Sequence, residues 1–308
     1  MDRRQFVRNA AITSTIIAGS GFWSTAGEKR FVEKNIKWSM GWLLWRGYSG
    51  RSISLSEAIQ DLYDLGADGI EFTPRKDELI RQGFTRETFR DLLVEKNLSV
   101  SGHYFSAPFY DTTKRGQIIS AFNESAESLR FFGAKNIIIG PPLANGSDNR
   151  ELIRGMVLLL NELGEIAIDQ GIQIGLHPHF GTMIETPEEI RLVMDLTNSK
   201  YVFFSPDTGH LQLGGCNILE ILNTYKDRIN YFHLKDVKGQ PDRVNWGTVN
   251  IRELGQGSID FTGIMRFLKQ INYNGWLNVE QDRTALTPRE SAAKSMDYLN
   301  KKLKPILY

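Results

Sequence analysis

Cysteine is nearly absent from the 308-residue chain, since Cys216 is the single one. A disulfide framework within the chain and a cysteine-rich zinc site are therefore excluded, and any metal ion must be held by histidine and carboxylate groups. An excess of one charge is also missing, because 37 Lys and Arg residues stand against 36 Asp and Glu residues. This balance produces no global field that would draw the chain to nucleic acid or to an acidic membrane, and it favours a small substrate.

Long apolar runs and a dinucleotide-binding motif are missing as well. No segment approaches the roughly 18 uncharged apolar residues that a membrane span needs, and the sequence contains no G-x-G-x-x-G. The remaining composition, 41% hydrophobic and 24% charged, is ordinary for a globular protein. The length allows one large α/β domain or two small ones.

The first residues resemble a twin-arginine export signal. Arg3 and Arg4 precede an uncharged, weakly apolar run from Ala10 to Trp23, and small residues follow that run. We expect a signal over residues 1–27, a folded domain over residues 31–308, and a periplasmic or otherwise exported protein. A cytosolic amphipathic tail, with a cytoplasmic location, is the alternative, because the cleavage site is not a clean A-x-A.

Short apolar runs then alternate with longer amphipathic segments, which is the pattern of βα units. Eight runs predict strands, and they begin at Ile36, Gly69, Leu98, Asn136, Ile172, Tyr201, Asn230 and Gly275. Helix starts are indicated by a capping box at Ser54 and Glu57 and by a first-turn proline at Pro187. Eight strands and eight helices predict a (β/α)8 TIM barrel of class α/β; a doubly wound open sheet is the alternative, which the missing glycine motif disfavours.

Polar side chains occur at the downstream ends of these predicted strands. They are Glu71, His103, His177, Asp207, His233 and Glu280. Chemistry in TIM barrels takes place at this rim, so all six are expected at one mouth. The last four end strands five to eight and supply two imidazoles and two carboxylates, a mixed set that suits Mn²⁺, Zn²⁺, Co²⁺ or Fe²⁺. A lone strand-end histidine is more often structural, but four convergent positions predict a metal site.

Two long irregular stretches, residues 141–148 and 237–257, each follow a predicted strand. Long connections after barrel strands are the usual place for lids and specificity elements. We therefore expect both stretches to form loops over the mouth.

From Ile36 onward the sequence resembles the xylose isomerase-like barrel superfamily of sugar isomerases, epimerases and dehydratases. Its blocks HPHFGT…IET, FSPDTGH, HLKD and GQGSIDF…GWLNVEQD resemble those of inosose (2-keto-myo-inositol) dehydratases. The resemblance implies a divalent ion, commonly Mn²⁺ or Co²⁺, with Zn²⁺, Fe²⁺ or Mg²⁺ as alternatives, and it carries ligand roles over to Asp207, His233 and Glu280. His177 departs from the epimerase branch, which usually has glutamate there, so it resembles the dehydratase branch and argues against a two-glutamate epimerisation.

Such a site predicts chemistry through an enediolate on a keto-sugar or keto-cyclitol. The ion would polarise a ketone and its neighbouring hydroxyl and so acidify the C–H bond between them. The predicted catalytic groups are His179, Lys235, Glu280 and His177, with His210 and Glu71 as further candidates for the base or acid. Departure of a β-hydroxyl would make the enzyme a lyase, whereas return of the proton elsewhere would make it an isomerase; both outcomes stay open.

Four side chains are predicted to contact the substrate: Glu71, His103, His210 and Trp38. Each has a structural alternative. Glu71 could pair with Arg75, His103 could line the pocket wall, and Trp38 could belong to the core. His210 follows Asp207 by three residues and could orient that ligand instead.

Other functions of this superfamily remain as alternatives. A sugar epimerase or isomerase would use the same ligands, and a non-catalytic sugar-binding barrel would retain the pocket without a metal. A phosphodiesterase of the abasic-site endonuclease type is disfavoured, because it needs a further histidine after His233 and a basic surface, and both are missing. We expect a small-molecule substrate, no nucleic acid and no stable membrane insertion, and we leave homo-oligomerisation open.

Overall fold

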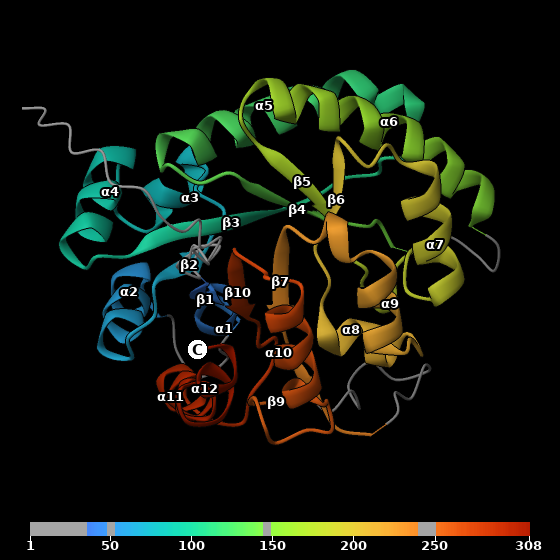
Figure 1. The fold of residues 1–308 in the computed structure, drawn as a ribbon. Coiled ribbons are helices and arrows are strands. Elements are labelled where there is room, and N and C mark those ends of the chain that lie inside the picture. Colours follow the sequence, from blue (N-terminus) through green and yellow to red (C-terminus); the bar gives the residue numbers. More distant parts are fainter. Residues whose placement is uncertain (1–35, 48–52, 144–148, 240–250) are drawn as a thin grey trace, which may run out of the picture. The chain divides into compact units, whose positions relative to one another are not determined.

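Eight parallel strands form the centre of the chain in the computed structural model, which describes residues 36–47, 53–143, 149–239 and 251–308 (Figure 1). They are β1 (Lys37–Gly41), β2 (Gly69–Glu71), β3 (Ser99–Ser106), β4 (Asn136–Gly140), β5 (Gln173–Leu176), β6 (Val202–Phe204), β7 (Tyr231–Leu234) and β10 (Trp276–Val279). Their order in the sheet is β6-β5-β4-β3-β2-β1-β10-β7. All eight predicted strands are present, and the predicted barrel architecture is confirmed.

The two edge strands of this sheet, β6 and β7, approach each other but share little hydrogen bonding. Two isolated parallel bridges join this seam, Phe204 with Ile229 and Asp207 with His233. The backbone N–H of His233 donates to the carbonyl of Pro206 at 2.9 Å. The barrel is therefore nearly closed, and its weakest seam lies between two of the predicted metal ligands.

Helices connect the strands and surround them. They are α1 (Leu43–Arg46), α2 (Leu55–Asp64), α3 (Lys76–Arg81), α4 (Arg86–Glu95), α5 (Arg115–Phe131), α6 (Arg150–Asp169), α7 (Pro187–Leu196), α8 (Thr208–Leu213), α9 (Ile218–Thr224), α10 (Phe261–Gln270), α11 (Pro288–Tyr298) and α12 (Lys304–Leu307). In Figure 1, α5, α6 and α7 lie on one side of the strands, and α10, α11 and α12 on the other. The sequence predicted one helix per strand, and short helices such as α1, α3 and α8 add to these in the segments that follow strands.

Local signals start α2 and α7 as predicted, and a left-handed glycine follows α6. Ser54 and Glu57 form a capping box at α2, in which each side chain accepts the other residue's backbone N–H. α7 begins after the N-cap Thr186 with proline in its first turn. α6 is followed by Gly171 at φ 72°, a left-handed conformation in which glycine has no steric cost.

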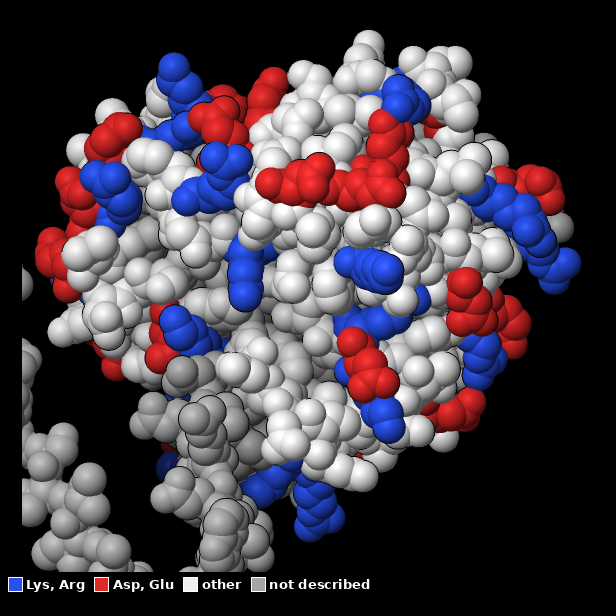
Figure 2. Space-filling view, turned by 45° about the horizontal axis from the view of Figure 1, so that its top comes forward, with Lys and Arg blue, Asp and Glu red and all other residues white. Residues whose placement is uncertain are grey.

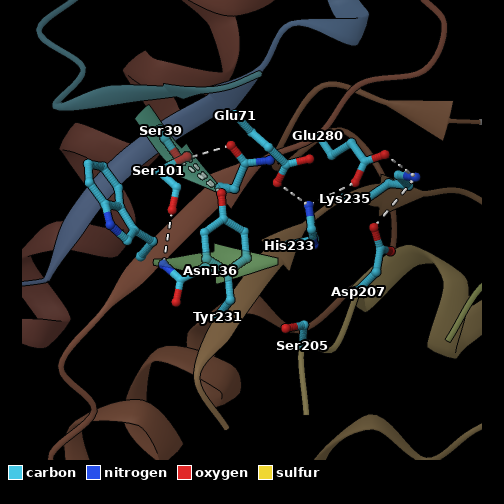
Figure 3. Close-up of polar contacts among 12 residues, drawn as sticks. Ser39, Glu71, Ser101, Asn136, Ser205, Asp207, Tyr231, His233, Lys235 and Glu280 are labelled. Carbon is cyan, nitrogen blue, oxygen red and sulfur yellow. Dashed lines mark hydrogen bonds and ion pairs between the residues drawn. The ribbon is translucent and has the colours of Figure 1, made fainter. Parts of the chain in front are cut away.

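Alternation along β7 divides its side chains between two environments. Phe232 and Leu234 belong to the buried apolar core shared with the helices. Tyr231 and His233 point the other way, into the barrel. The hydroxyl of Tyr231 reaches Ser101 Oγ on β3 at 2.8 Å and approaches Ser39 Oγ on β1 at 3.5 Å. A hydrogen-bonded polar layer thus crosses the barrel interior beneath His233 (Figure 3).

The segment after β7 is partly regular. β8 (Asp236–Val237) pairs antiparallel with β9 (Ile251–Arg252), so the stretch over residues 237–257, expected to be irregular, contains strand residues at Val237 and Ile251–Arg252. Two-residue strands are too short to give an alternating pattern. The Asp236 carboxylate fixes the return of the chain by accepting the backbone N–H groups of Gly255 and Gly257 at 2.9 and 2.8 Å.

Several sequence-based expectations lie outside the described residues: the export signal over residues 1–27, part of the loop over residues 141–148, and residues 240–250 of the second loop. In the part of the chain that is described, no helix combines the length and apolarity needed to cross a membrane. Figure 2 shows basic and acidic side chains intermingled on the face that it presents, in keeping with the formal charge of +1.

Candidate metal-binding active site

The four predicted ligands meet at the carboxyl ends of β5, β6, β7 and β10. Two groups have ligand atoms that all lie within 4.8 Å of one another: His177, Asp207 and His210, and His177, His233 and Glu280. His177 belongs to both groups and connects them. The structure thus brings residues separated by more than a hundred positions, such as His177 and Glu280, into one place and adds His210 to them. Metal binding itself stays a prediction.

The donor atoms of this cluster fit an ion. Buried atoms without a hydrogen-bond partner among the described residues include both ring nitrogens of His177, Asp207 Oδ2, His233 Nδ1 and Glu280 Oε2. Buried polar atoms are nearly always hydrogen-bonded, because leaving one unpaired costs roughly 1–3 kcal/mol. A cation that accepts nitrogen and oxygen ligands would pair with Asp207 Oδ2, His233 Nδ1, Glu280 Oε2 and one of the two ring nitrogens of His177.

Lys235 is the buried cation of the site. Its side chain is 0% exposed, and its Nζ lies 3.5 Å from Asp207 Oδ2, 3.3 Å from Glu280 Oε1 and 2.8 Å from Asp282 Oδ2. Lys235 Nζ also lies 2.8 Å from His210 Nε2. Burial lowers the pKa of Lys235, but the three carboxylates outweigh burial and raise it well above its usual value. The ammonium group therefore stays charged and holds these carboxylates in place.

His233 is held between two carboxylates on the other side of the cluster (Figure 3). Its Nε2 lies 2.7 Å from Glu71 Oε2 and 3.4 Å from Glu280 Oε2. Burial lowers the pKa of His233, but Glu71 and Glu280 outweigh it and raise the pKa to about 9. Metal ligation requires a neutral imidazole, so binding of an ion at His233 would release a proton.

The two central ligands differ in the protonation state that burial favours. Burial, followed by the charge of His233, holds the pKa of His177 well below its usual value, so its ring is a neutral ligand. Burial raises the pKa of Asp207 to about 7, although Lys235 opposes this shift. Counted as ionised, Glu71, Asp207, Glu280 and Asp282 exceed Lys235 and a protonated His233 by two negative charges. With His233 neutral, as ligation requires, the excess is three, of which one divalent cation would balance two.

Asp207 and His210 are coupled through α8. Asp207 is the N-cap of this helix, and its Oδ1 accepts the backbone N–H of His210 at 2.8 Å while Oδ2 faces the cluster. The rings of His210 and His179 lie with centroids 3.6 Å apart. His210 therefore fits the alternative of a residue that orients a ligand, and it also supplies a third donor beside His177.

A cavity of about 360 Å³ adjoins the cluster. Its lining includes Glu71, Tyr104, His179, Glu280 and Asp282. A second cavity, of about 950 Å³, lies against α3, α4 and α5 and has His103 in its wall. Three predicted groups, Glu71, His179 and Glu280, thus face the smaller cavity beside the ligands.

Trp38 lies elsewhere. Its side chain is 2% exposed in the core, and Lys304 Nζ on α12 lies 5.6 Å from the centre of its ring. It lines neither cavity, so the predicted substrate contact does not fit its position. Among the tryptophans that the structure describes, the one that lines both cavities is Trp42, immediately after β1. Side chains alternate between the two faces of a strand, and Trp38 lies on the face toward the helices. The number of tryptophans in this segment did not indicate which of them lies at a cavity.

Glu71 and His103 have partners that the sequence did not indicate. Glu71 contacts His233 and not Arg75, whose guanidinium lies 3.3 Å from Asp77. His103 Nδ1 lies 3.0 Å from Thr73 Oγ1.

Two further residues of the site escaped the sequence analysis. Asp282 contacts Lys235 and lines the smaller cavity; its position two residues after Glu280, on the same side of an extended segment, was the available signal. Tyr104 packs its ring edge-on against His177 with centroids 5.5 Å apart. No sequence pattern singled out Tyr104, because the contact is made between β3 and the end of β5.

Comparison with known proteins places this geometry in a family. The model of the xylose isomerase-like TIM barrel family matches residues 59–302. The chain belongs to this family. The family's barrel agrees with the eight parallel strands, and the resemblance inferred from the sequence blocks is confirmed.

Curated relatives and solved structures of the family are similar over most of the chain. An inosose dehydratase of Clostridium perfringens (strain 13 / Type A) is 31% identical over 243 residues, which cover 70% of this chain and 81% of that protein. An inosose dehydratase of Bacillus velezensis is 27% identical over 306 residues, which cover 88% of this chain and 98% of that protein. The crystal structure of the IOLI protein with a bound zinc atom has a TM-score of 0.71 at 19% identity. The match covers 88% of this chain and 98% of the IOLI chain. At this identity the IOLI structure shows a shared fold.

Proposed function

We propose that this protein is a divalent-metal-dependent lyase that removes water from a keto-cyclitol or keto-sugar. The observation that carries the proposal is the set of buried ligand atoms on His177, Asp207, His233 and Glu280 that lack a hydrogen-bond partner among the described residues, beside a cavity of about 360 Å³. Inosose dehydratases among the relatives support this substrate class, and the zinc-binding neighbour supports a metal site on this fold.

The ligands named above would hold the ion, which when bound supplies Lewis acidity to a ketone and its adjacent hydroxyl. Either Mn²⁺ or Co²⁺ suits the mixed nitrogen and oxygen donors, and Zn²⁺, Fe²⁺ and Mg²⁺ are alternatives. Lys235 would keep Asp207 and Glu280 ionised and positioned. It lines neither cavity, so its contacts favour positioning over the direct catalytic role predicted for it.

His179 is the residue of this site best suited to move a proton. Its Nδ1 lies 2.8 Å from the carbonyl oxygen of Phe180, which can only accept, so Nδ1 carries the hydrogen and Nε2 is the basic nitrogen. Burial, followed by the charge of Lys235, lowers the pKa of His179, so the ring is neutral and able to accept a proton. His179 Nε2 would take the proton next to the ketone and deliver it to the departing hydroxyl, which leaves as water.

The test uses 2-keto-myo-inositol and a panel of 3-keto-sugars with protein loaded with Mn²⁺ or Co²⁺. We expect a product lighter by one water that absorbs in the ultraviolet as an unsaturated ketone. His179→Gln should lower kcat by about 10²–10⁴-fold, the usual contribution of a general base, while one equivalent of ion is retained. A product of unchanged mass would indicate the isomerase alternative.

Loss of activity in His179→Gln must be separated from loss of the site. Lys301→Met, at an exposed position of the C-terminal region, serves as the matched control and should keep the wild-type rate. The lyase proposal fails if the loaded protein neither exchanges substrate protons with solvent nor forms product on any compound of the panel. Absence of bound metal under every loading condition would favour a non-catalytic sugar-binding barrel.

We also propose that residues 1–27 direct export by a twin-arginine route, on the strength of the pattern around Arg3 and Arg4. Replacing both arginines by lysine should keep the protein in the cytoplasm, whereas the unmodified chain should appear in the periplasmic fraction. Equal distribution of the two forms between the fractions would support the cytosolic alternative.

A further inference from the structure

The second cavity is larger than the one at the metal ligands and shares its walls. Five residues line both: Trp42, Arg46, Phe72, Thr73 and Tyr104. The cavity of about 950 Å³ continues from them along the ends of β2 and β3 to α5. Ligand pockets in proteins range over about 300–1,000 Å³, so the smaller cavity suits a single ring and the larger one exceeds what such a substrate needs.

We propose that the larger cavity holds a neutral group joined through oxygen to the keto-ring, an inference that rests on the lyase function proposed above. The preferred substrate is then a keto-glycoside, and the leaving group is an alcohol. The keto-ring would occupy the smaller cavity beside the ligands. The aglycone, a second sugar or an aryl group, would lie beyond Trp42 and Tyr104.

Unpaired polar groups and aromatic faces in the larger cavity favour such an occupant. His103 is 3% exposed, and its Nε2 has no hydrogen-bond partner among the described residues, although Nδ1 contacts Thr73. Trp42 Nε1, at the boundary of the two cavities, is unpaired in the same part of the chain. Both side chains can bond hydroxyl or ether oxygens. Phe72 and Phe105 add apolar faces to the wall, on which a sugar or aryl ring can pack.

The larger cavity is lined by basic side chains and by carboxylates, namely Arg46, Arg75, Lys76, Arg81, Arg86 and Lys114 with Asp77, Glu78, Glu124 and Glu127, so its charge is mixed and does not single out an anion. Three arginines of its wall have carboxylate partners. Arg75 lies 3.3 Å from Asp77, Arg86 lies 3.1 Å from Glu127, and Arg81 contacts Glu78. Paired in this way, these cations supply little attraction for a phosphate or carboxylate.

The proposed reaction is the same elimination as the dehydration, except that an alkoxy group leaves in place of the hydroxyl group. In a 3-keto-glycoside the base takes the proton from the carbon between the ketone and the anomeric carbon. A carbon–carbon double bond forms, the bond from the anomeric carbon to the aglycone oxygen breaks, and the proton passes to that oxygen. The products are an unsaturated keto-sugar and a free alcohol, and no oxidant or reductant is consumed.

The experiment compares 4-nitrophenyl 3-keto-glucoside, methyl 3-keto-glucoside and 2-keto-myo-inositol on metal-loaded protein. We expect kcat/KM for the aryl glycoside to exceed that for the methyl glycoside. Because 4-nitrophenol is also a better leaving group than methanol, the contribution of the larger cavity is the part of this rate that a cavity-filling variant removes. Release of 4-nitrophenol and of the unsaturated ketone should be equimolar.

A variant that fills the larger cavity isolates its contribution. Ala121 is exposed on α5 and lines this cavity only. Ala121→Trp should lower kcat/KM for the aryl glycoside by about 10-fold or more and leave the compounds without an aglycone ring unchanged. Leu158→Trp, at an exposed position of α6 that lines neither cavity, is the matched control and should change nothing.

The outcomes separate this inference from the function on which it rests. Conversion of 2-keto-myo-inositol without conversion of either glycoside, or an aryl glycoside rate that Ala121→Trp leaves intact, overturns the keto-glycoside proposal and leaves the lyase standing. Failure to convert any of the three compounds overturns the lyase itself.

Discussion

Replacing Lys235 by methionine removes a charge that the structure buries completely among carboxylates. The side chain is 0% exposed and contacts Asp207, Glu280 and Asp282 within 3.5 Å. Methionine keeps much of the apolar stem but leaves the carboxylates without their cation. Breaking a buried ion pair by removing one partner costs roughly 3–5 kcal/mol, so we expect the free energy of unfolding to fall by about that amount in metal-free protein.

Urea unfolding in the presence of EDTA measures this loss. A divalent ion at 100 times its Kd stabilises the folded state by about 2.7 kcal/mol, and the same ion should stabilise Lys235→Met by more, because it would replace the missing charge. Lys301→Met is the control: Lys301 lies 2.7 Å from Asp297, but the two side chains are 70% and 59% exposed. Such a pair contributes about 0–1 kcal/mol. The reasoning is refuted if Lys235→Met unfolds at the wild-type urea concentration in EDTA.

Three further changes test other parts of the structure by urea unfolding. Tyr231→Phe removes the hydroxyl that contacts Ser101 at 2.8 Å, and we expect a loss of about 1 kcal/mol; an unchanged midpoint would show that the polar layer does not stabilise the barrel. Thr186→Ala removes the N-cap of α7 and should cost about 1 kcal/mol, whereas Thr186→Ser should restore the stability. Gly209→Ala would place a Cβ 2.7 Å from Lys235 Cγ, so we expect a loss of about 1–3 kcal/mol and a lower metal content by elemental analysis; wild-type values for both would mean that the lysine stem moves aside freely.

The architecture could be predicted because each strand is a short buried run and because several helices have start signals, such as the capping boxes of α2 and α7. Barrel geometry then placed the strand ends at one rim, which is why His177, Asp207, His233 and Glu280 could be grouped across a hundred residues.

The pairing inside the site could not be predicted. The contact of Glu71 with His233 and the ion pairs of Lys235 depend on distances across the barrel, which linear spacing does not report. For the same reason the sequence could not distinguish Trp38 from Trp42 as a substrate contact. Both side chains have the same chemistry, and only the direction in which the backbone presents each ring separates the core residue from the cavity residue.

Because β6 and β7 share few backbone hydrogen bonds, a bound ion would help to hold the barrel closed. Asp207 and His233 form one of the two bridges across that gap and are also two of the expected ligands. An ion bound to both would therefore join β6 and β7, the two edge strands of the sheet, which share few backbone hydrogen bonds. Backbone amides near residues 204–207 and 229–233 should then exchange with deuterium faster once the ion is removed, while those of β2 and β3 on the opposite wall keep their rates.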